Sequence, residues 1–276
     1  MGVPPADRAE GIPPDQPTTR HVSASDSGVP PDLESTQPPT IQVGILTKGK
    51  PTLSMVLASL LLQETHDIRI HIVDTSDTPV VNRDDVRFAL RLAFDRGISC
   101  NYEYSREKDR AFSLGRLRLL EALDGPHLCL MDDDIVLASS TLARIVPVLQ
   151  ANPVYGYVVP NCVNSLYARL FGGSRASYSP GGVIYQDAPV RSALMEYYSS
   201  TVDVLDRLAS EQKAWEIAFL TELFDLSGRR LFVQTDNLSY HLDYQEAPNW
   251  ALSEADVLRR SRLKARALAR KYLQVP

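Results

Sequence analysis

The chain has 276 residues, of which 44% are hydrophobic and 23% charged, and its formal net charge is −5. This composition is typical of a globular protein with a sizeable core, and the acidic balance argues against a nucleic-acid partner. The three cysteines have neither zinc-site nor disulfide-framework spacing, which favours a reducing, cytoplasmic setting. The start lacks the basic and apolar regions of a signal peptide, and no apolar run is long enough to span a bilayer.

Residues 1–40 contain nine of the nineteen prolines and few large apolar residues. Such a segment cannot bury enough surface to offset the entropy of ordering it. We therefore predict a disordered N-terminal tail.

From residue 41 onward, apolar runs with strand character alternate with helical patterns. Strands are predicted at 41–47, 68–76, 99–105 and 128–131, and helices at 52–64, 84–97 and 111–125. Thr52 is the expected N-cap of the first helix, and Gly97 is expected to end the second. This alternation predicts a parallel α/β sheet flanked by helices.

The second half of the chain is less regular. We predict a helix at 140–152, a strand at 155–161, a Gly- and Ser-rich mobile loop at 171–182, a helical segment at 201–228 ending at Gly228, a strand at 229–235 and a basic helix at 253–273.

An acidic triplet, Asp132, Asp133 and Asp134, directly follows the apolar strand at 128–131. Ionised carboxylates are costly to bury unless a cation or hydrogen-bond donors compensate them. Ligands of parallel α/β sheets bind at the C-terminal ends of the strands. We therefore expect the triplet to converge on one crevice with the other residues that follow strand ends, Thr47, Lys48 and Asp74. The alternative is a solvated turn or helix cap, although repulsion between adjacent acids argues against an idle triplet.

Four stretches resemble, in order and spacing, the GT-A fold glycosyltransferases of family 2. They are VGILTKGKPTLSMVLASLLLQ, HIVDTSD, GRLRLLEALDGPHLCLMDDD and WEIAFLTELFDLSGRRLFVQTDNLSYH, and the match runs over about residues 41–242. The resemblance implies a Rossmann-like, mostly parallel central sheet flanked by helices. It also implies one catalytic domain at 41–250, with a nucleotide-binding half at 41–137 and an acceptor-binding half at 138–250, before the basic helix within 251–276.

The resemblance further implies inverting transfer of a sugar from a nucleotide-sugar, a UDP-sugar above all, with Mn²⁺ or Mg²⁺ as cofactor. Carboxylate oxygens suit these hard cations, and an added imidazole favours Mn²⁺. The implied metal ligands are Asp134 and His241. The implied nucleotide-sugar contacts are Thr47, Lys48, Asp74, Arg116, Asp132 and Asp133. Ordinary structural roles stay open for several of these, such as a turn-forming role for Asp74 and an exposed position for Arg116.

The family takes its catalytic base from a Glu-Asp pair, which falls here on Glu216 and Ile217. The usual aspartate is therefore an isoleucine, and Glu216 becomes the candidate base. Glu222 is the second choice, six residues further along the helical segment.

Two other functions remain open at this point. A sugar nucleotidyltransferase would be expected to carry a Gly-rich loop followed by an arginine directly after the first strand. The sequence TKGKPT does not provide this pattern. A non-catalytic nucleotide-sugar-binding protein is compatible with Ile217. The acceptor could be a small molecule, a lipid-linked intermediate or a peptide. The basic helix at 253–273 is expected to pack on the catalytic domain or on a partner subunit of a homo-oligomer, with contact to an anionic membrane surface as the alternative.

Overall fold

The computed structural model describes residues 41–65, 67–106, 111–152, 154–164, 182–208, 214–242 and 254–274. The predicted tail at 1–40 lies outside the described residues, as does the predicted loop at 171–182 apart from Gly182.

The described residues form an eight-stranded sheet with the strand order β3-β2-β1-β4-β7-β6-β8-β5. Strands β3, β2, β1 and β4 are parallel neighbours, as are β6 and β8, whereas β7 is antiparallel to β4 and β6, and β5 is antiparallel to β8. The bounds are β1 (Ile41–Thr47), β2 (Ile68–Asp74), β3 (Ser99–Tyr104), β4 (His127–Asp132), β5 (Ile135–Leu137), β6 (Tyr155–Asn164), β7 (Val183–Tyr185) and β8 (Arg230–His241). This mostly parallel sheet confirms the predicted fold class.

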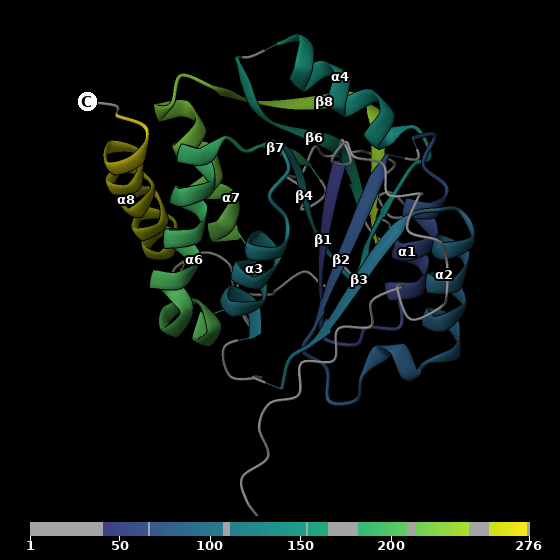
Figure 1. Ribbon diagram of the computed structural model, residues 1–276. Coiled ribbons are helices and arrows are strands. Elements are labelled where there is room, and N and C mark those ends of the chain that lie inside the picture. Colours follow the sequence, from purple (N-terminus) through teal and green to yellow (C-terminus); the bar gives the residue numbers. More distant parts are fainter. Residues whose placement is uncertain are drawn as a thin grey trace, which may run out of the picture.

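Helices cover both faces of the sheet (Figure 1). Helices α1 and α2 lie on one side, and α3, α6, α7 and α8 lie on the other. Their bounds are α1 (Leu53–Leu61), α2 (Asp84–Asp95), α3 (Ala111–Ala122), α4 (Thr141–Ala151), α6 (Ala188–Leu208), α7 (Ala214–Leu226) and α8 (Glu254–Tyr272), and a short 3₁₀ helix, η3, spans Val80–Asn82.

Strand β1 lies between two hydrophobic cores, and every one of its residues is buried. Ile41, Val43 and Ile45 belong to the core formed with α1 and α2, and Leu46 belongs to the core formed with α3, α6 and α7. A central parallel strand is covered by helices on both faces, which explains why the sequence of β1 is apolar almost throughout.

Two glycine predictions are confirmed, because α2 and α7 end in the same hydrogen-bonded motif. Gly97 and Gly228 adopt φ angles of 70° and 72°. In each case the next residue donates its backbone N–H to the carbonyl oxygen five positions earlier, from Ile98 to Ala93 and from Arg229 to Phe224. This is the Schellman motif, in which a left-handed glycine terminates the helix.

The helical segment predicted at 201–228 is wrong as a single element. Helix α6 already begins at Ala188, and α7 begins at Ala214. Asp187 is the N-cap of α6, because its Oδ1 accepts the backbone N–H of Val190 at 3.0 Å. The sequence carries this signal, since Asp187 precedes Pro189 in the first turn, whereas residues 209–213 contain no glycine or proline to mark a boundary. Strands β5 and β7 were not predicted, because three-residue strands are too short to show a period.

The basic C-terminal helix is confirmed and packs against α6 and α7. Ala265, Leu268 and Ala269 are buried in the core on that side of the sheet, while Leu263 is 52% exposed among basic residues. The structure therefore supports the packing role. Contact of the exposed basic face with a membrane surface stays a prediction, and within the described ranges we find no helix with the length and apolar character needed to cross a bilayer.

Candidate active site

The residues predicted from strand ends do meet at one edge of the sheet. In the strand register, Thr47 at the end of β1 is paired with Asp74 at the end of β2, and Leu46 is paired with Asp132 at the end of β4. The parallel direction of these strands places their C-terminal ends together, which is where ligands of such sheets bind.

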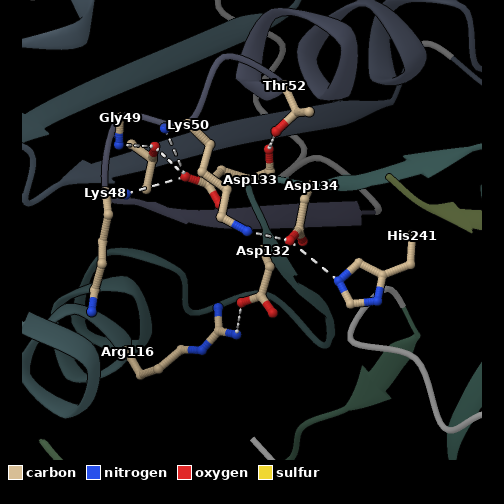
Figure 2. Close-up of polar contacts among 10 residues, drawn as sticks. Lys48, Gly49, Lys50, Thr52, Arg116, Asp132, Asp133, Asp134 and His241 are labelled. Carbon is tan, nitrogen blue, oxygen red and sulfur yellow. Dashed lines mark hydrogen bonds and ion pairs between the residues drawn. The ribbon is translucent and has the colours of Figure 1, made fainter. Parts of the chain in front are cut away.

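Asp133 holds the turn that follows β1 (Figure 2). Its Oδ2 accepts hydrogen bonds from the Thr47 hydroxyl at 2.7 Å and from the backbone N–H groups of Lys48 and Lys50 at 3.1 and 3.4 Å. Thr52 stands at the N-cap position of α1, but its hydroxyl donates to the backbone carbonyl of Asp133 at 2.7 Å and caps no helical N–H. Burial raises the pKa of the Asp133 carboxyl, and the Thr47 hydroxyl partly offsets that shift.

Gly49 makes the tight turn between β1 and α1. Its φ angle is 88°, and a Cβ atom there would lie 2.9 Å from the Cβ of Ser76. Its N–H donates to Thr47 Oγ1 at 2.9 Å. Arg83 closes the turn from the other side, because its guanidinium donates to the carbonyl oxygens of Gly49, Lys50 and Pro51 at 3.2, 2.8 and 3.1 Å. The turn is therefore fixed by the triplet on one side and by the start of α2 on the other.

Asp132 is neutralised by a buried arginine. Arg116 on α3 is 0% exposed, and its guanidinium lies 2.9 Å from Asp132 Oδ1 and 3.1 Å from the carbonyl oxygen of Met131. The guanidinium also lies 5.1 Å from the centre of the Phe112 ring. The alternative that Arg116 is simply exposed is wrong, because α3 faces the sheet here and the ion pair compensates the burial of both charges.

Asp134 lies between a lysine and a histidine (Figure 2). Its Oδ2 is 2.6 Å from Lys50 Nζ and 3.2 Å from His241 Nε2, and its side chain is 1% exposed. His241 reaches this place because β8 pairs with β5, with His241 opposite Ile135, and Leu242 donates its N–H to the carbonyl oxygen of Asp134 at 2.9 Å. Residues more than one hundred positions apart in the sequence thus form one polar cluster.

The pair of Asp134 and His241 fits a divalent cation of the predicted kind. Across the ranges that the structure describes, no group of three or more His, Cys, Asp or Glu side chains forms a closed metal cage. A cage is not required, because Mg²⁺ bound with nucleotides commonly takes one or two carboxylates and fills its other positions with water and phosphate oxygens. One carboxylate and one imidazole on the same centre suit Mn²⁺ as well.

Asp74 shapes the loop after β2. Its Oδ1 accepts the N–H of Ser76 at 2.8 Å, and its Oδ2 accepts the N–H of Val80 at 2.8 Å and the hydroxyl of Tyr102 at 2.6 Å. Burial and the hydrogen bond to Asp74 raise the pKa of Tyr102. The turn-forming alternative for Asp74 is thus present in the structure, and a contact to the nucleotide base stays a prediction.

The remaining predicted residues lie in different surroundings. Lys48 is exposed, and its side chain points away from Asp134 (Figure 2). Position 216 is in α7, but the Glu216 side chain lies outside the described residues. Glu222 on the same helix forms an ion pair with Arg266 on α8 at 2.6 Å, so it faces the C-terminal helix.

Sequence reasoning missed Lys50 and Arg83. Lys50 stands two positions after Lys48, and no sequence pattern distinguishes the two lysines, because only the conformation of the turn decides which side chain meets the triplet. Arg83 directly precedes α2, where an arginine is expected to be solvated, and only the fold brings it to the turn after β1.

No protein-family model and no curated protein matches the sequence. Solved structures do match the fold. One is the mannosyltransferase PcManGT from Pyrobaculum calidifontis in complex with GDP-Man and Mn²⁺, with a TM-score of 0.57, 17% sequence identity and coverage of 87% of this chain and 69% of that chain. Another is TarS from S. aureus, with a TM-score of 0.54, 13% identity and coverage of 85% of this chain.

A third match is residues 1–349 of S. aureus TarS in complex with UDP-GlcNAc, with a TM-score of 0.52, 10% identity and coverage of 81% of this chain. The chain spans 43% of the longer TarS structure and 65% of the shorter one. At these identities the likeness concerns the fold alone, and it confirms the predicted GT-A-like glycosyltransferase fold. Membership of family 2 in particular stays a prediction.

Proposed function

We propose that the chain is a metal-dependent, inverting glycosyltransferase that transfers a sugar from a UDP-sugar to an acceptor hydroxyl. The observation that carries the proposal is the cluster of Asp132, Asp133, Asp134 and His241 at the C-terminal strand ends of a glycosyltransferase fold. One of the matching structures is described as a complex with a nucleotide-sugar and Mn²⁺. This match supports a donor of the same class and a divalent cation here.

Asp134 and His241 are the residues that would hold Mn²⁺ or Mg²⁺. The cation would supply Lewis-acid stabilisation of the negative charge that develops on the leaving diphosphate. Arg116 orients the Asp132 carboxylate at the end of β4 through their buried ion pair. Thr47 and Asp133 keep the turn after β1 closed beside the site, and Lys48 on this turn is the proposed donor contact.

Glu216 is the proposed base. In the transfer step the acceptor oxygen forms a bond to the anomeric carbon, the bond from that carbon to the diphosphate oxygen breaks, and the acceptor proton passes to the Glu216 carboxylate. The resemblance to the family places the base at position 216, and Glu222 lies six residues further along α7. The ion pair of Glu222 with Arg266 supports Glu216 over Glu222.

Nucleotide binding tests the donor and metal sites together. Calorimetry with UDP and with GDP, each with and without Mn²⁺, should show metal-dependent binding of UDP to the wild-type chain. Asp134→Ala should lose the metal-dependent part, because it removes the carboxylate on which Lys50 and His241 converge. Asp84→Ala, which removes an exposed carboxylate on α2, is the matched control and should bind like the wild type. Full metal-dependent affinity in Asp134→Ala would contradict the metal assignment.

Turnover tests the base. With UDP-sugar donors and a panel of small-molecule, lipid-linked and peptide acceptors, Glu216→Gln should bind UDP and Mn²⁺ normally but turn over at least about a hundredfold more slowly. Glu222→Gln is the control on the same helix and should stay near the wild-type rate. A fast Glu216→Gln variant together with an inactive Glu222→Gln variant would reverse the assignment.

The same assay separates the other two functions. A non-catalytic nucleotide-sugar-binding protein, which Ile217 in place of the usual aspartate keeps open, would bind UDP-sugar with metal and release no UDP with any acceptor. A nucleotidyltransferase would form a nucleotide-sugar from a nucleoside triphosphate and a sugar phosphate, and would release pyrophosphate.

A further inference from the structure

Lys50 is the cation that compensates Asp134 in this structure. Its Nζ lies 2.6 Å from Asp134 Oδ2, which is nearer than His241 Nε2 at 3.2 Å to the same oxygen. The Asp134 side chain is 1% exposed and that of Lys50 is 31% exposed. A carboxylate at this depth needs such a charge partner, because its desolvation is not repaid by water.

A metal ion bound to Asp134 and His241 would compete with the Lys50 ammonium for the same carboxylate oxygen. A divalent cation held by Asp134 and His241 would sit within about 2.0–2.6 Å of its ligand oxygen, a distance comparable to that of the Lys50 ammonium. Two cations at one carboxylate oxygen repel strongly in a buried setting. Lys50 and the metal ion are therefore alternative partners of Asp134.

The side chain of Lys50 can leave while its backbone stays. The Lys50 N–H is bound to Asp133, and its carbonyl oxygen accepts from Arg83 at 2.8 Å. A lysine stem of four carbons with rotatable bonds can turn its ammonium to a new partner from this fixed point. If a cation bound both Asp134 and a diphosphate, the phosphate oxygens would lie near Asp134, within reach of the Lys50 ammonium.

We propose that Lys50 holds Asp134 until a divalent cation and a nucleotide diphosphate bind, and that the released ammonium of Lys50 then binds the diphosphate. This inference rests on the proposed function, and it makes Lys50 a residue that couples metal binding to donor binding. A metal ion alone must displace Lys50 without giving it a new partner. A metal ion that arrives with a diphosphate supplies that partner.

Removing the Lys50 charge should raise the affinity for Mn²⁺ in the absence of nucleotide and lower the affinity for UDP in the presence of Mn²⁺. Lys50→Met should bind Mn²⁺ without nucleotide at least about tenfold more tightly than the wild type, measured by the electron paramagnetic resonance signal of free Mn²⁺, because the competing charge is gone. At saturating Mn²⁺, the same variant should bind UDP at least about fivefold more weakly in calorimetry, because the charged phosphate contact is lost. Mere damage to the site would weaken both affinities.

Lys48→Met is the matched control for the nucleotide-free Mn²⁺ measurement alone, because it removes the same charge from the same turn while the Lys48 side chain points away from Asp134 (Figure 2). Its nucleotide-free Mn²⁺ affinity should change by less than about twofold, since an exposed charge is screened by water and salt.

Lys50→Gln should behave like Lys50→Met, and it replaces Lys50→Met in the test if circular dichroism shows that the latter is unfolded. Unchanged or weaker Mn²⁺ binding in both Lys50 variants would overturn the inference. Absence of UDP binding to the wild type would instead overturn the proposed function, and the nucleotide-free Mn²⁺ comparison would still decide whether Lys50 competes.

Discussion

Arg116 is the largest fully buried side chain among the described residues, and it carries a charge. Its guanidinium binds the carboxylate of Asp132 and the carbonyl of Met131, and it lies near the ring of Phe112. An arginine suits this place because its planar group can donate in several directions at once and remains charged when buried. Arg116 therefore stabilises the folded protein and also orients a carboxylate of the candidate site.

We expect Arg116→Met to lower the free energy of unfolding by about 3–5 kcal/mol, because it leaves the Asp132 carboxylate buried without its cation. Urea denaturation followed by circular dichroism measures this loss. Arg118→Met, two positions further along α3, removes a partly exposed arginine paired with Glu103. That control should cost about 1 kcal/mol or less. Similar losses in both variants would show that Arg116 has no special structural role.

Among the elements, α8 shows how a basic helix becomes part of a core. Ser261, Ala265, Leu268 and Ala269 recur at helical spacing, and all four are buried. The basic residues occupy the other positions. Two of them pair with carboxylates of neighbouring helices, Arg266 with Glu222 on α7 and Lys271 with Glu196 on α6.

The same substitution at two positions of α8 tests this arrangement. Leu268→Ala should destabilise the protein by about 2–4 kcal/mol, because it opens a cavity in a close-packed core. Leu263→Ala changes a side chain that is 52% exposed and should cost less than about 0.5 kcal/mol. Thermal unfolding of both variants provides the comparison. Equal effects would mean that α8 does not dock as the structure shows.

The turn between β1 and α1 is the element that positions the site, and Gly49 is its most constrained residue. Gly49→Ala should cost more than about 1–2 kcal/mol, since the left-handed backbone is unfavourable for alanine and the new Cβ would meet Ser76 at 2.9 Å. Gly97→Ala shares the left-handed backbone but has nothing within 4 Å of the new Cβ. It should therefore cost only about 1 kcal/mol. Denaturant titration of both variants separates the cost of the left-handed backbone from the cost of the contact with Ser76. A smaller loss of unfolding free energy for Gly49→Ala than for Gly97→Ala would contradict the close contact at Gly49.

For the whole molecule, the cores on both faces of the sheet are built from residues of the predicted domain at 41–250 and from α8. The N-terminal segment is rich in proline and poor in large apolar residues. A chain that starts at Pro39 should keep the melting temperature and the UDP affinity of the full chain, because no large apolar contribution is removed. Differential scanning calorimetry and nucleotide titration measure the two quantities. A drop of several degrees would show that the segment packs on the domain.

The local features of this fold could be predicted from short stretches of the sequence. The apolar runs at 41–47 and 128–131 predicted buried strands, and Gly97 and Gly228 predicted helix ends, because strand burial and left-handed glycines are properties of short segments. The acidic triplet after a strand also indicated where the site would lie, since parallel strands all end at one edge of the sheet.

The side chains that contact the acidic triplet could not be predicted in this way, because they come from distant segments of the chain. Asp132 binds Arg116 from α3, Asp133 binds Thr47 and the turn after β1, and Asp134 lies between Lys50 and His241. The contact of Asp134 with His241 depends on the pairing of β8 with β5, and β5 is a three-residue strand with no visible period in the sequence. Lys48 and Lys50 are chemically identical, and the φ angle of 88° at Gly49 between them belongs to the turn that brings Lys50, and not Lys48, to Asp134. Contacts between distant segments depend on strand pairing and backbone direction, which no short stretch of sequence contains.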